Sequence, residues 1–241
     1  MTASEVKGRL HDLRFPGESD AYRRARDELL EAEIDVRRRI EAAAAQRREL
    51  PLGGEVPTDY EFEEYAGYSD EPRTVHLSEL FEDGKDTLFL YSHMFNPDET
   101  GQPLAVPCPA CTSIIDALDG EAPHITQRIN LAVSAKVPIQ RFRDHARSRG
   151  WQHVRLLSCT ENTYNHDYHA EKSDARQLPI ATVFVRRDGR VHHFWSSELA
   201  YAPTDPGEHP RHVDFMWPLW NVFDRTPEGR GSGWEPSLNY S

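Results

Sequence analysis

The spacing of hydrophobic positions predicts one long helix near the beginning of the chain. Between about Asp20 and Leu50, apolar side chains recur every three or four residues, at Tyr22, Ala25, Leu29, Ala32, Val36, Ile40 and Ala43. This spacing places them on one face of a helix, and the Arg, Asp and Glu residues between them suit a solvated face. Pro51 and the Gly53-Gly54 pair would end the helix. We expect this helix to be an arm that packs either on the main domain or on a partner subunit. The second arrangement would make the protein a homodimer.

Farther along, short apolar runs alternate with helical patterns. Buried strands are predicted at 87–91, 129–134 and 153–158. Helices are expected after Cys111, with a stop at Gly120, and over 139–148, with Gly150 closing the second. Alternation of strands and helices is typical of an α/β layer with parallel strands.

A hairpin and an aromatic segment complete the pattern. The hairpin is predicted over 180–185 and 190–195, with its turn at Asp188-Gly189. The aromatic segment follows His209 and is expected to form a short helix broken at Pro218. We therefore predict three parts: an N-terminal helical arm and linker (1–73), an α/β domain (74–202) and a C-terminal extension packed on the domain (203–241).

Composition narrows the functional classes. The 241 residues carry 40 acidic against 28 basic side chains, a formal charge of −12, which disfavours nucleic acid and anionic membranes as partners. No apolar run is long enough to cross a bilayer, and 1–20 lacks the apolar core of a secretion signal. We expect a soluble cytoplasmic protein. Three cysteines cannot form a disulfide scaffold for a chain of this size.

Two of these cysteines, in the segment Cys108-Pro-Ala-Cys111, indicate redox chemistry. Cys108 falls just before a predicted helix, and Pro109 occupies the first-turn position, where a missing N–H costs nothing. The positive end of a helix lowers the pKa of a nearby thiol, so Cys108 is expected to be the attacking thiol. Cys111 lies one turn further on and is expected to resolve a mixed disulfide. A zinc site normally needs four ligands, and the chain has no second cysteine pair to complete a four-thiolate site.

Several segments together resemble a known family. The Cys108–Cys111 pair between a strand and a helix, followed by Leu178-Pro-Ile180 before a hairpin, resembles the thioredoxin superfamily. The chain looks more closely like a bacterial family of thioredoxin-like proteins of unknown function, described as predicted dithiol–disulfide oxidoreductases. The segments that carry this resemblance include 13–17, 77–81, 108–112, 162–165, 167–169, 193–195, 197–198 and 214–220. It implies a thioredoxin-like α/β fold with a long N-terminal helix and an aromatic-rich C-terminal extension, without a cofactor. It also implies a thiol or disulfide substrate, either a protein or a small molecule.

The resemblance also suggests residues of a substrate site. In thioredoxin-like folds a cis-proline before the hairpin lies against the cysteine pair, and Pro179 occupies that place, although a trans proline opening a strand is the alternative. Tyr164 and Asn165 belong to the segment leading to Pro179 and are expected to line the substrate groove.

Cys159 is expected to be a small buried hydrophobic residue. Val106 and Pro107 replace the tryptophan that precedes the pair in ordinary thioredoxins, and the added segments favour a narrow substrate range.

The histidines of the chain suggest metal binding as an alternative to redox chemistry at the cysteine pair. Two cysteines with a histidine suit copper or another soft metal, and the candidate histidines are His93, His169 and His193. The chain would then be a metal-binding protein or a metalloenzyme on the same fold. A third alternative, a binding module without a reaction, is weakened by the presence of both Cys108 and Cys111.

Overall fold

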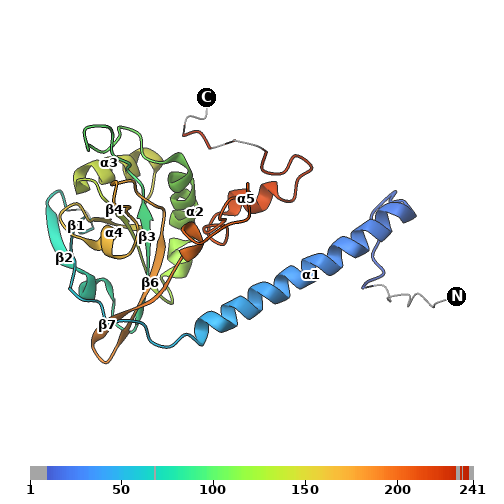
Figure 1. Ribbon diagram of the computed structural model, residues 1–241, viewed down its shortest axis with the longest axis horizontal. Helices are drawn as coiled ribbons and strands as arrows, with labels where there is room; N and C mark the ends of the chain where they lie inside the picture. Colours follow the sequence, from blue (N-terminus) through green and yellow to red (C-terminus); the bar gives the residue numbers. More distant parts are fainter. Residues whose placement is uncertain (1–9, 68, 232–233, 235, 239–241) are drawn as a thin grey trace. The chain divides into compact units, whose positions relative to one another are not determined.

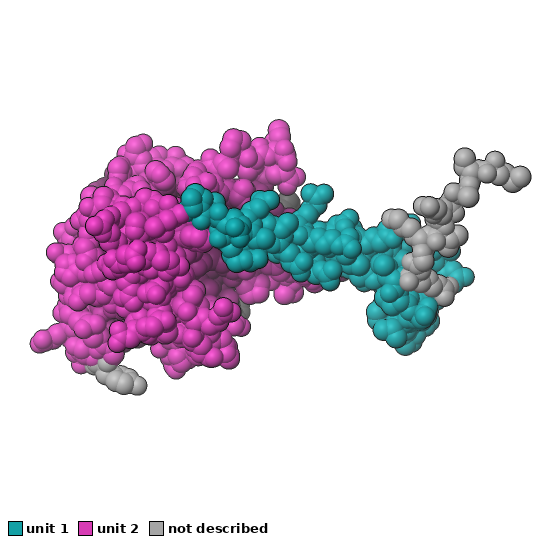
Figure 2. All heavy atoms as spheres, turned by 90° about the horizontal axis from the view of Figure 1, so that it is seen from below, with its two compact units in different colours: residues 1–51 teal, residues 52–241 magenta. Residues whose placement is uncertain are grey.

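The computed structural model describes residues 10–67, 69–231, 234 and 236–238. The chain divides into two compact units, the first ending at Pro51 and the second beginning at Leu52 (Figure 2). Each unit is described by itself below.

The first unit contains the long helix that the apolar spacing predicts. Helix α1 spans Asp20–Arg48, and the Ser19 hydroxyl caps it by accepting a hydrogen bond from the Tyr22 N–H at 3.2 Å. Asp20 lies in its first turn and two arginines in its last turn, as the helix dipole favours. Within α1 the only buried residue is Arg23, whose guanidinium pairs with Glu18 and Asp27.

The second unit is built on a seven-stranded mixed sheet (Figure 1). Its strands are β1 Glu61–Tyr65, β2 Pro72–His76, β3 Thr87–His93, β4 Asn130–Ala135, β5 Arg155–Ser158, β6 Ala181–Arg187 and β7 Arg190–Ser196. Their order is β2-β1-β5-β4-β3-β6-β7. Strands β3, β4 and β5 are parallel, whereas β6 and β7 continue the sheet as an antiparallel hairpin. The β1–β2 hairpin adds to the other edge, next to β5.

Helices and short turns cover this sheet. They are 3-10 turn η1 Leu77–Leu80, helices α2 Pro109–Ile125, α3 Ile139–Arg149 and α4 Tyr164–Asp167, 3-10 turn η2 Glu198–Ala200, and helix α5 Pro218–Phe223. A parallel β3-α2-β4-α3-β5 unit followed by an antiparallel hairpin is a thioredoxin-like α/β arrangement, so the predicted fold class is confirmed. Gly150 closes α3 in the left-handed conformation (φ 78°), as its position predicts.

The two faces of the sheet carry separate hydrophobic clusters. Strand β3 shows the alternation: Tyr91 joins a cluster with α2 and α3, whereas Leu88 and Leu90 join a second cluster. The second cluster includes residues of η1 and the Tyr164 side chain of α4. The cysteine helix α2 therefore lies on the face of the first cluster.

Strands β1 and β2 lie within 1–73, the segment that the sequence assigns to an arm and linker. In the structure the second unit already begins at Leu52, so 52–73 belongs to the sheet domain. The Glu64 carboxylate on β1 is buried and accepts hydrogen bonds from Arg73 of β2 and Arg155 of β5, at 2.7 Å and 2.6 Å. These charge-assisted hydrogen bonds join three neighbouring strands at this edge.

Helix α2 runs farther than the sequence indicates. It passes the predicted stop at Gly120 and includes Pro123 before ending at Ile125. Burial of Ile115, Leu118 and Ala122 compensates for the roughly 1 kcal/mol that an interior glycine costs. The buried carboxylate of Asp119 accepts hydrogen bonds from the backbone N–H groups of residues 152–154, which ties α2 to the turn before β5.

The C-terminal segment completes the first cluster. Val213, Trp217 and Trp220 are buried in it, and the Trp217 indole N–H donates to the Ser113 hydroxyl of α2 at 3.0 Å. Pro218 begins helix α5 instead of breaking it, because a proline at the first helical position lacks only an N–H that would be unpaired. Among the residues described, no helix combines the length and apolar character needed to cross a bilayer.

Candidate functional site

The cysteine pair lies at the N-terminus of α2, where the sequence predicts it. Cys108 is the N-cap residue, Pro109 begins the helix, and the Cys111 backbone N–H donates to the Cys108 Sγ at 3.4 Å. The Cys108 N–H is held by the Met94 carbonyl, which fixes the approach to the helix. Both cysteines are free thiols; Cys108 is half-buried, whereas Cys111 is 1% exposed. An incoming molecule therefore meets Cys108 first.

The surroundings of Cys111 keep its thiol protonated. Burial raises the pKa of Cys111 well above its usual range, and the hydrogen bond and charge of Cys108 raise it further. The backbone of Met94 and the nearby Tyr91 hydroxyl on β3 act in the opposite direction, because both favour the Cys111 thiolate. Tyr91 is fully buried, and burial together with the cysteines raises the pKa of its own hydroxyl. The Cys111 thiol is thus held neutral beside a buried hydroxyl.

Thr112 connects the helix start to two histidines. Its buried hydroxyl donates to the Cys108 carbonyl at 3.0 Å and lies 3.3 Å from the Nε2 atoms of both His93 and His145. A hydroxyl has one hydrogen, so both imidazoles must donate to Thr112 through Nε2–H. This network holds the backbone carbonyl of Cys108 in place.

Both histidines favour the neutral form. Burial lowers the pKa of His93 well below its usual range, and the neighbouring His145 lowers it further. Burial also lowers the pKa of His145, and the charge of Arg149 acts in the same direction. Aromatic rings of Phe95, Phe142 and Trp151 surround His93. His93 is therefore a neutral buried hydrogen-bond donor next to the pair.

The other two candidate metal ligands lie elsewhere. His193 on β7 packs against Tyr168 and its Nε2 lies 2.9 Å from the Ser196 hydroxyl, while His169 packs against Tyr201. Within the described part of the chain, no group of three or more His, Cys, Asp or Glu side chains could hold a metal ion. The structure thus does not assemble the predicted set of Cys108 and Cys111 with these histidines.

Pro179 differs from the expected cis-proline. The described residues contain no cis peptide bond, so the bond before Pro179 is trans. Its carbonyl accepts a hydrogen bond from His212 Nε2 at 3.2 Å, and the next carbonyl, of Ile180, accepts one from the Ser92 N–H. These backbone acceptors are used within the protein instead of being presented to a substrate.

Tyr164 and Asn165, expected to line a substrate groove, are buried core residues. Tyr164 is 0% exposed in the second cluster, and the Asn165 side-chain oxygen accepts a hydrogen bond from the Cys159 thiol at 3.3 Å. Their position is incompatible with direct contact with a substrate. Cys159 is itself fully buried, as expected, and burial raises its pKa to about 12.

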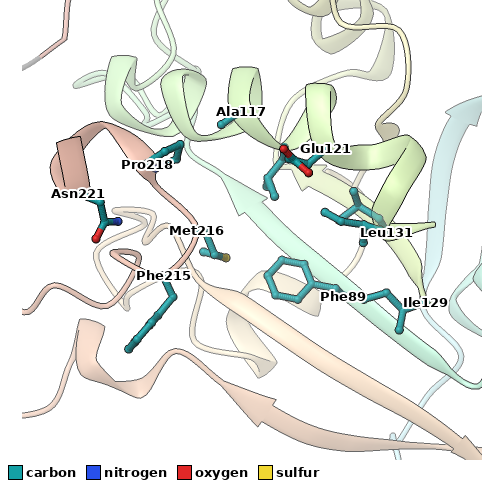
Figure 3. A pocket seen from close by; sticks show the side chains of 11 residues that line it. Phe89, Ala117, Glu121, Ile129, Leu131, Phe215, Met216, Pro218 and Asn221 are labelled. Carbon is teal, nitrogen blue, oxygen red and sulfur yellow. The ribbon is translucent and has the colours of Figure 1, made fainter. Parts of the chain in front are cut away.

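An apolar pocket lies at the far half of α2 (Figure 3). It has a volume of about 530 Å³, and its walls come from α2, from Phe89 and Leu131 of the sheet, and from Phe215 and Met216 of the C-terminal segment. None of the residues that line it is a cysteine or one of the histidines beside the pair. The pocket and the cysteine pair are separate features of this face.

Sequence reasoning missed three members of the site. Tyr91 reads as one more apolar residue of a strand, and His145 as a polar position on a solvated helix. Thr112 reads only as a polar residue of the helix that follows Cys111. Nothing in the local sequence shows that strand, helix and loop bring these side chains together around Cys108 and Cys111.

Comparisons with known proteins place the chain in a family. The family described as "Bacterial protein of unknown function (DUF899)" matches residues 14–240. No curated protein sequence matches significantly. Similar solved structures include peroxidoxin BcpB from Mycobacterium tuberculosis, with 17% identity, 72% of this chain and 98% of that chain covered, and a TM-score of 0.43. The reduced 2-Cys peroxiredoxin of Plasmodium vivax has 21% identity, coverages of 68% and 95%, and a TM-score of 0.44.

Proposed function

We propose that this chain, which belongs to that DUF899 family, is a thiol–disulfide oxidoreductase acting through Cys108 and Cys111. The observation that carries the proposal is the arrangement of the pair at the N-terminus of α2. Cys108 is accessible and its sulfur accepts the Cys111 N–H, whereas Cys111 is buried one turn into the helix. An N–H group and the positive end of a helix both stabilise a thiolate on Cys108.

The reaction follows from the two positions. The Cys108 thiolate attacks one sulfur of a substrate disulfide, forming a mixed disulfide and releasing the other half as a thiolate. Cys111 then loses its proton and attacks the Cys108 sulfur, which releases the second half. The protein is oxidised from a dithiol to a disulfide, and the substrate disulfide is reduced to two thiols. Run in reverse, the same steps oxidise a dithiol substrate.

The electrostatics of the pair support this order. The charge of Cys108 is one cause of the raised pKa of Cys111. Formation of the mixed disulfide removes that charge, so the pKa of Cys111 falls at the step in which its thiolate is required. The Tyr91 hydroxyl remains to stabilise that thiolate. The resting protein thus protects the resolving thiol until Cys108 has reacted.

Trapping of the intermediate tests the proposal. Cys111→Ser should hold a stable mixed disulfide between Cys108 and a model disulfide such as 5,5′-dithiobis(2-nitrobenzoate), visible as an added mass on the intact protein. Cys108→Ser should abolish both the adduct and reduction of the disulfide, and Cys159→Ala is the matched control that should keep full activity. Full disulfide reduction by Cys108→Ser would refute the proposal.

The metal alternative has no comparable support, since the predicted ligands do not converge. The cytoplasmic location remains a prediction, and it fits a dithiol kept reduced by its compartment. The reduction potential of the pair, measured against glutathione, would decide the direction of the reaction.

A further inference from the structure

The apolar pocket beside α2 has the size of a small-molecule site. Its volume of about 530 Å³ falls within the roughly 300–1,000 Å³ that ligand pockets occupy. Leu118 of α2 and Leu131 of β4 are buried in its walls, and Phe89 of β3 is half-buried. Phe215, in the wall formed by the C-terminal segment, is 64% exposed. The pocket therefore offers apolar surface on several sides to the apolar body of a ligand.

The C-terminal wall is held in place by contacts outside the pocket. Asp214 pairs with Arg230 at 2.9 Å, and the Trp217 indole N–H donates to the Ser113 hydroxyl of α2 at 3.0 Å. These two contacts flank residues 215–216, which line the pocket. Because the wall is already fixed, a ligand does not have to order it, which reduces the cost of binding.

The polar side chains of the pocket can only accept hydrogen bonds from a ligand. They are Glu121 of α2 and Asn221 of α5, which come from different walls (Figure 3). The Asn221 Nδ2 donates to the backbone carbonyls of Asp214 and Trp217 at 2.7 Å and 3.1 Å, which leaves Oδ1 as an acceptor. The Glu121 carboxylate is exposed, and no side chain in the described part of the chain pairs with it. The hydrogen-bond donor must therefore come from the ligand.

The surroundings favour a positive charge on that donor. Among the described residues that line the pocket, Glu121 is the only charged one. Phe89 and Phe215 add aromatic rings, whose faces attract cations. An ammonium group thus meets an opposite charge, whereas a ligand carboxylate would be repelled by Glu121.

We propose that this pocket binds a small molecule with an apolar body and an ammonium head group. The apolar body packs against Leu118, Leu131 and Phe89. The ammonium group donates to the Glu121 carboxylate at the rim. Glu121 follows Cys111 by ten residues, about 15 Å along the helix, so the ligand occupies a site separate from the cysteine pair.

Three probes with one apolar body test the head group. Isothermal titration calorimetry of the full chain at pH 7.5 compares 4-phenylbutylamine, 4-phenylbutan-1-ol and 4-phenylbutanoate. The amine should bind with a Kd of about 1 mM or below. It should bind about three- to thirty-fold more tightly than the alcohol, because the ion pair and the aromatic rings both favour the cation. The carboxylate should bind most weakly.

Three variants locate the binding. Glu121→Gln should weaken the amine about two- to five-fold and leave the alcohol unchanged, since only the amine loses an ion pair. The matched control Glu161→Gln removes the same charge from the exposed loop between β5 and α4 and should change neither. Ala117→Trp should fill the pocket and abolish binding of all three probes. Glu121→Gln alters an exposed side chain, so the test holds even if Ala117→Trp unfolds.

Four results would overturn the proposal. The unaltered protein binds no amine, as it would if another protein segment filled the pocket. The carboxylate binds as tightly as the amine. Glu121→Gln weakens the amine no more than Glu161→Gln does. Ala117→Trp, shown to be folded by circular dichroism, binds the amine as before. None of these measurements involves Cys108 or Cys111, so the redox proposal stands or falls separately.

Discussion

The imidazole rings of His93 and His145 stack with their centroids 5.6 Å apart, and both donate to the hydroxyl of Thr112. The pKa of each is lowered, so unfolded chains bind protons more readily than the folded protein once the pH drops below about 6.5. Stability is therefore complete above that pH and declines as the pH falls toward the lowered folded-state values.

The lowered pKa values of these two imidazoles, caused mainly by burial, predict a fold that loses stability in acid. Replacing His93 by Phe should reduce the pH dependence of the free energy of unfolding between pH 6.5 and 5, by at most about 1.4 kcal/mol per pH unit. Phe suits the aromatic surroundings of His93. Urea unfolding at a series of pH values measures the slope, with His124→Gln at the exposed end of α2 as the control. An unchanged slope in His93→Phe would contradict the prediction.

The contribution of the Thr112 hydroxyl to stability can be tested by substitution. Thr112→Val keeps the shape but leaves the buried Nε2–H of His93 and the half-buried Nε2–H of His145 without their acceptor, so it should destabilise the protein by about 1–3 kcal/mol. Thr112→Ser retains the hydroxyl and should cost less. Urea unfolding at pH 7.5 compares the two. A loss in Thr112→Val no larger than the loss in Thr112→Ser would contradict the prediction.

The Glu64 carboxylate should matter most near neutral pH. Burial favours its protonated form, but the hydrogen bonds from Arg155 and Arg73 outweigh burial, and the pKa of Glu64 is lowered. Its contribution is therefore present above about pH 4.5, the ordinary value for Glu, and is lost as the pH falls through the lowered folded-state pKa.

Glu64→Gln should accordingly destabilise the protein by about 2 kcal/mol at pH 7, because the arginine hydrogen bonds to the remaining oxygen lose their charge assistance and those to the other position, now an NH2 donor, are lost. Thermal or urea unfolding at pH 7 and pH 4 measures the difference between variant and parent. Glu63→Gln, at the adjacent exposed position of β1, is the matched control. A destabilisation by Glu64→Gln that is larger at pH 4 than at pH 7 would contradict the prediction.

The three thiols should react at very different rates. With its pKa raised to about 12, Cys159 is ionised in about one molecule in 10⁴ at pH 8 and is also inaccessible. Titration of the native protein with 5,5′-dithiobis(2-nitrobenzoate) should show rapid attack through Cys108, with Cys159 reacting only after denaturation. Rapid labelling of Cys159 in the folded protein, detected by peptide mass mapping, would show that the second cluster opens.

The parallel strands, the hairpin and the cysteine helix could be predicted because their apolar spacing is local. Strand β1 could not, since the segment Glu61-Phe-Glu-Glu-Tyr65 is mostly charged and its inward Glu64 is neutralised by arginines from β2 and β5. The helix end predicted at Gly120 was wrong, because burial of the apolar face of α2 outweighed the low helix propensity of glycine. Of the site, the cysteines could be placed by motif, whereas the packing of Tyr164 and the partner of the Pro179 carbonyl depend on distant segments.

Helix α2 is anchored along much of its length. Trp217 holds it at Ser113, Arg149 and Trp151 hold Asp116, and the turn before β5 holds Asp119. A helix held at these three points has little freedom to move as a rigid body. In the proposed reaction, it should therefore keep its position when the cysteine pair is oxidised or reduced. In the proposed reaction, any rearrangement between the dithiol and the disulfide is then expected in the loop that enters Cys108, and a partner that distinguishes the two forms would contact that loop.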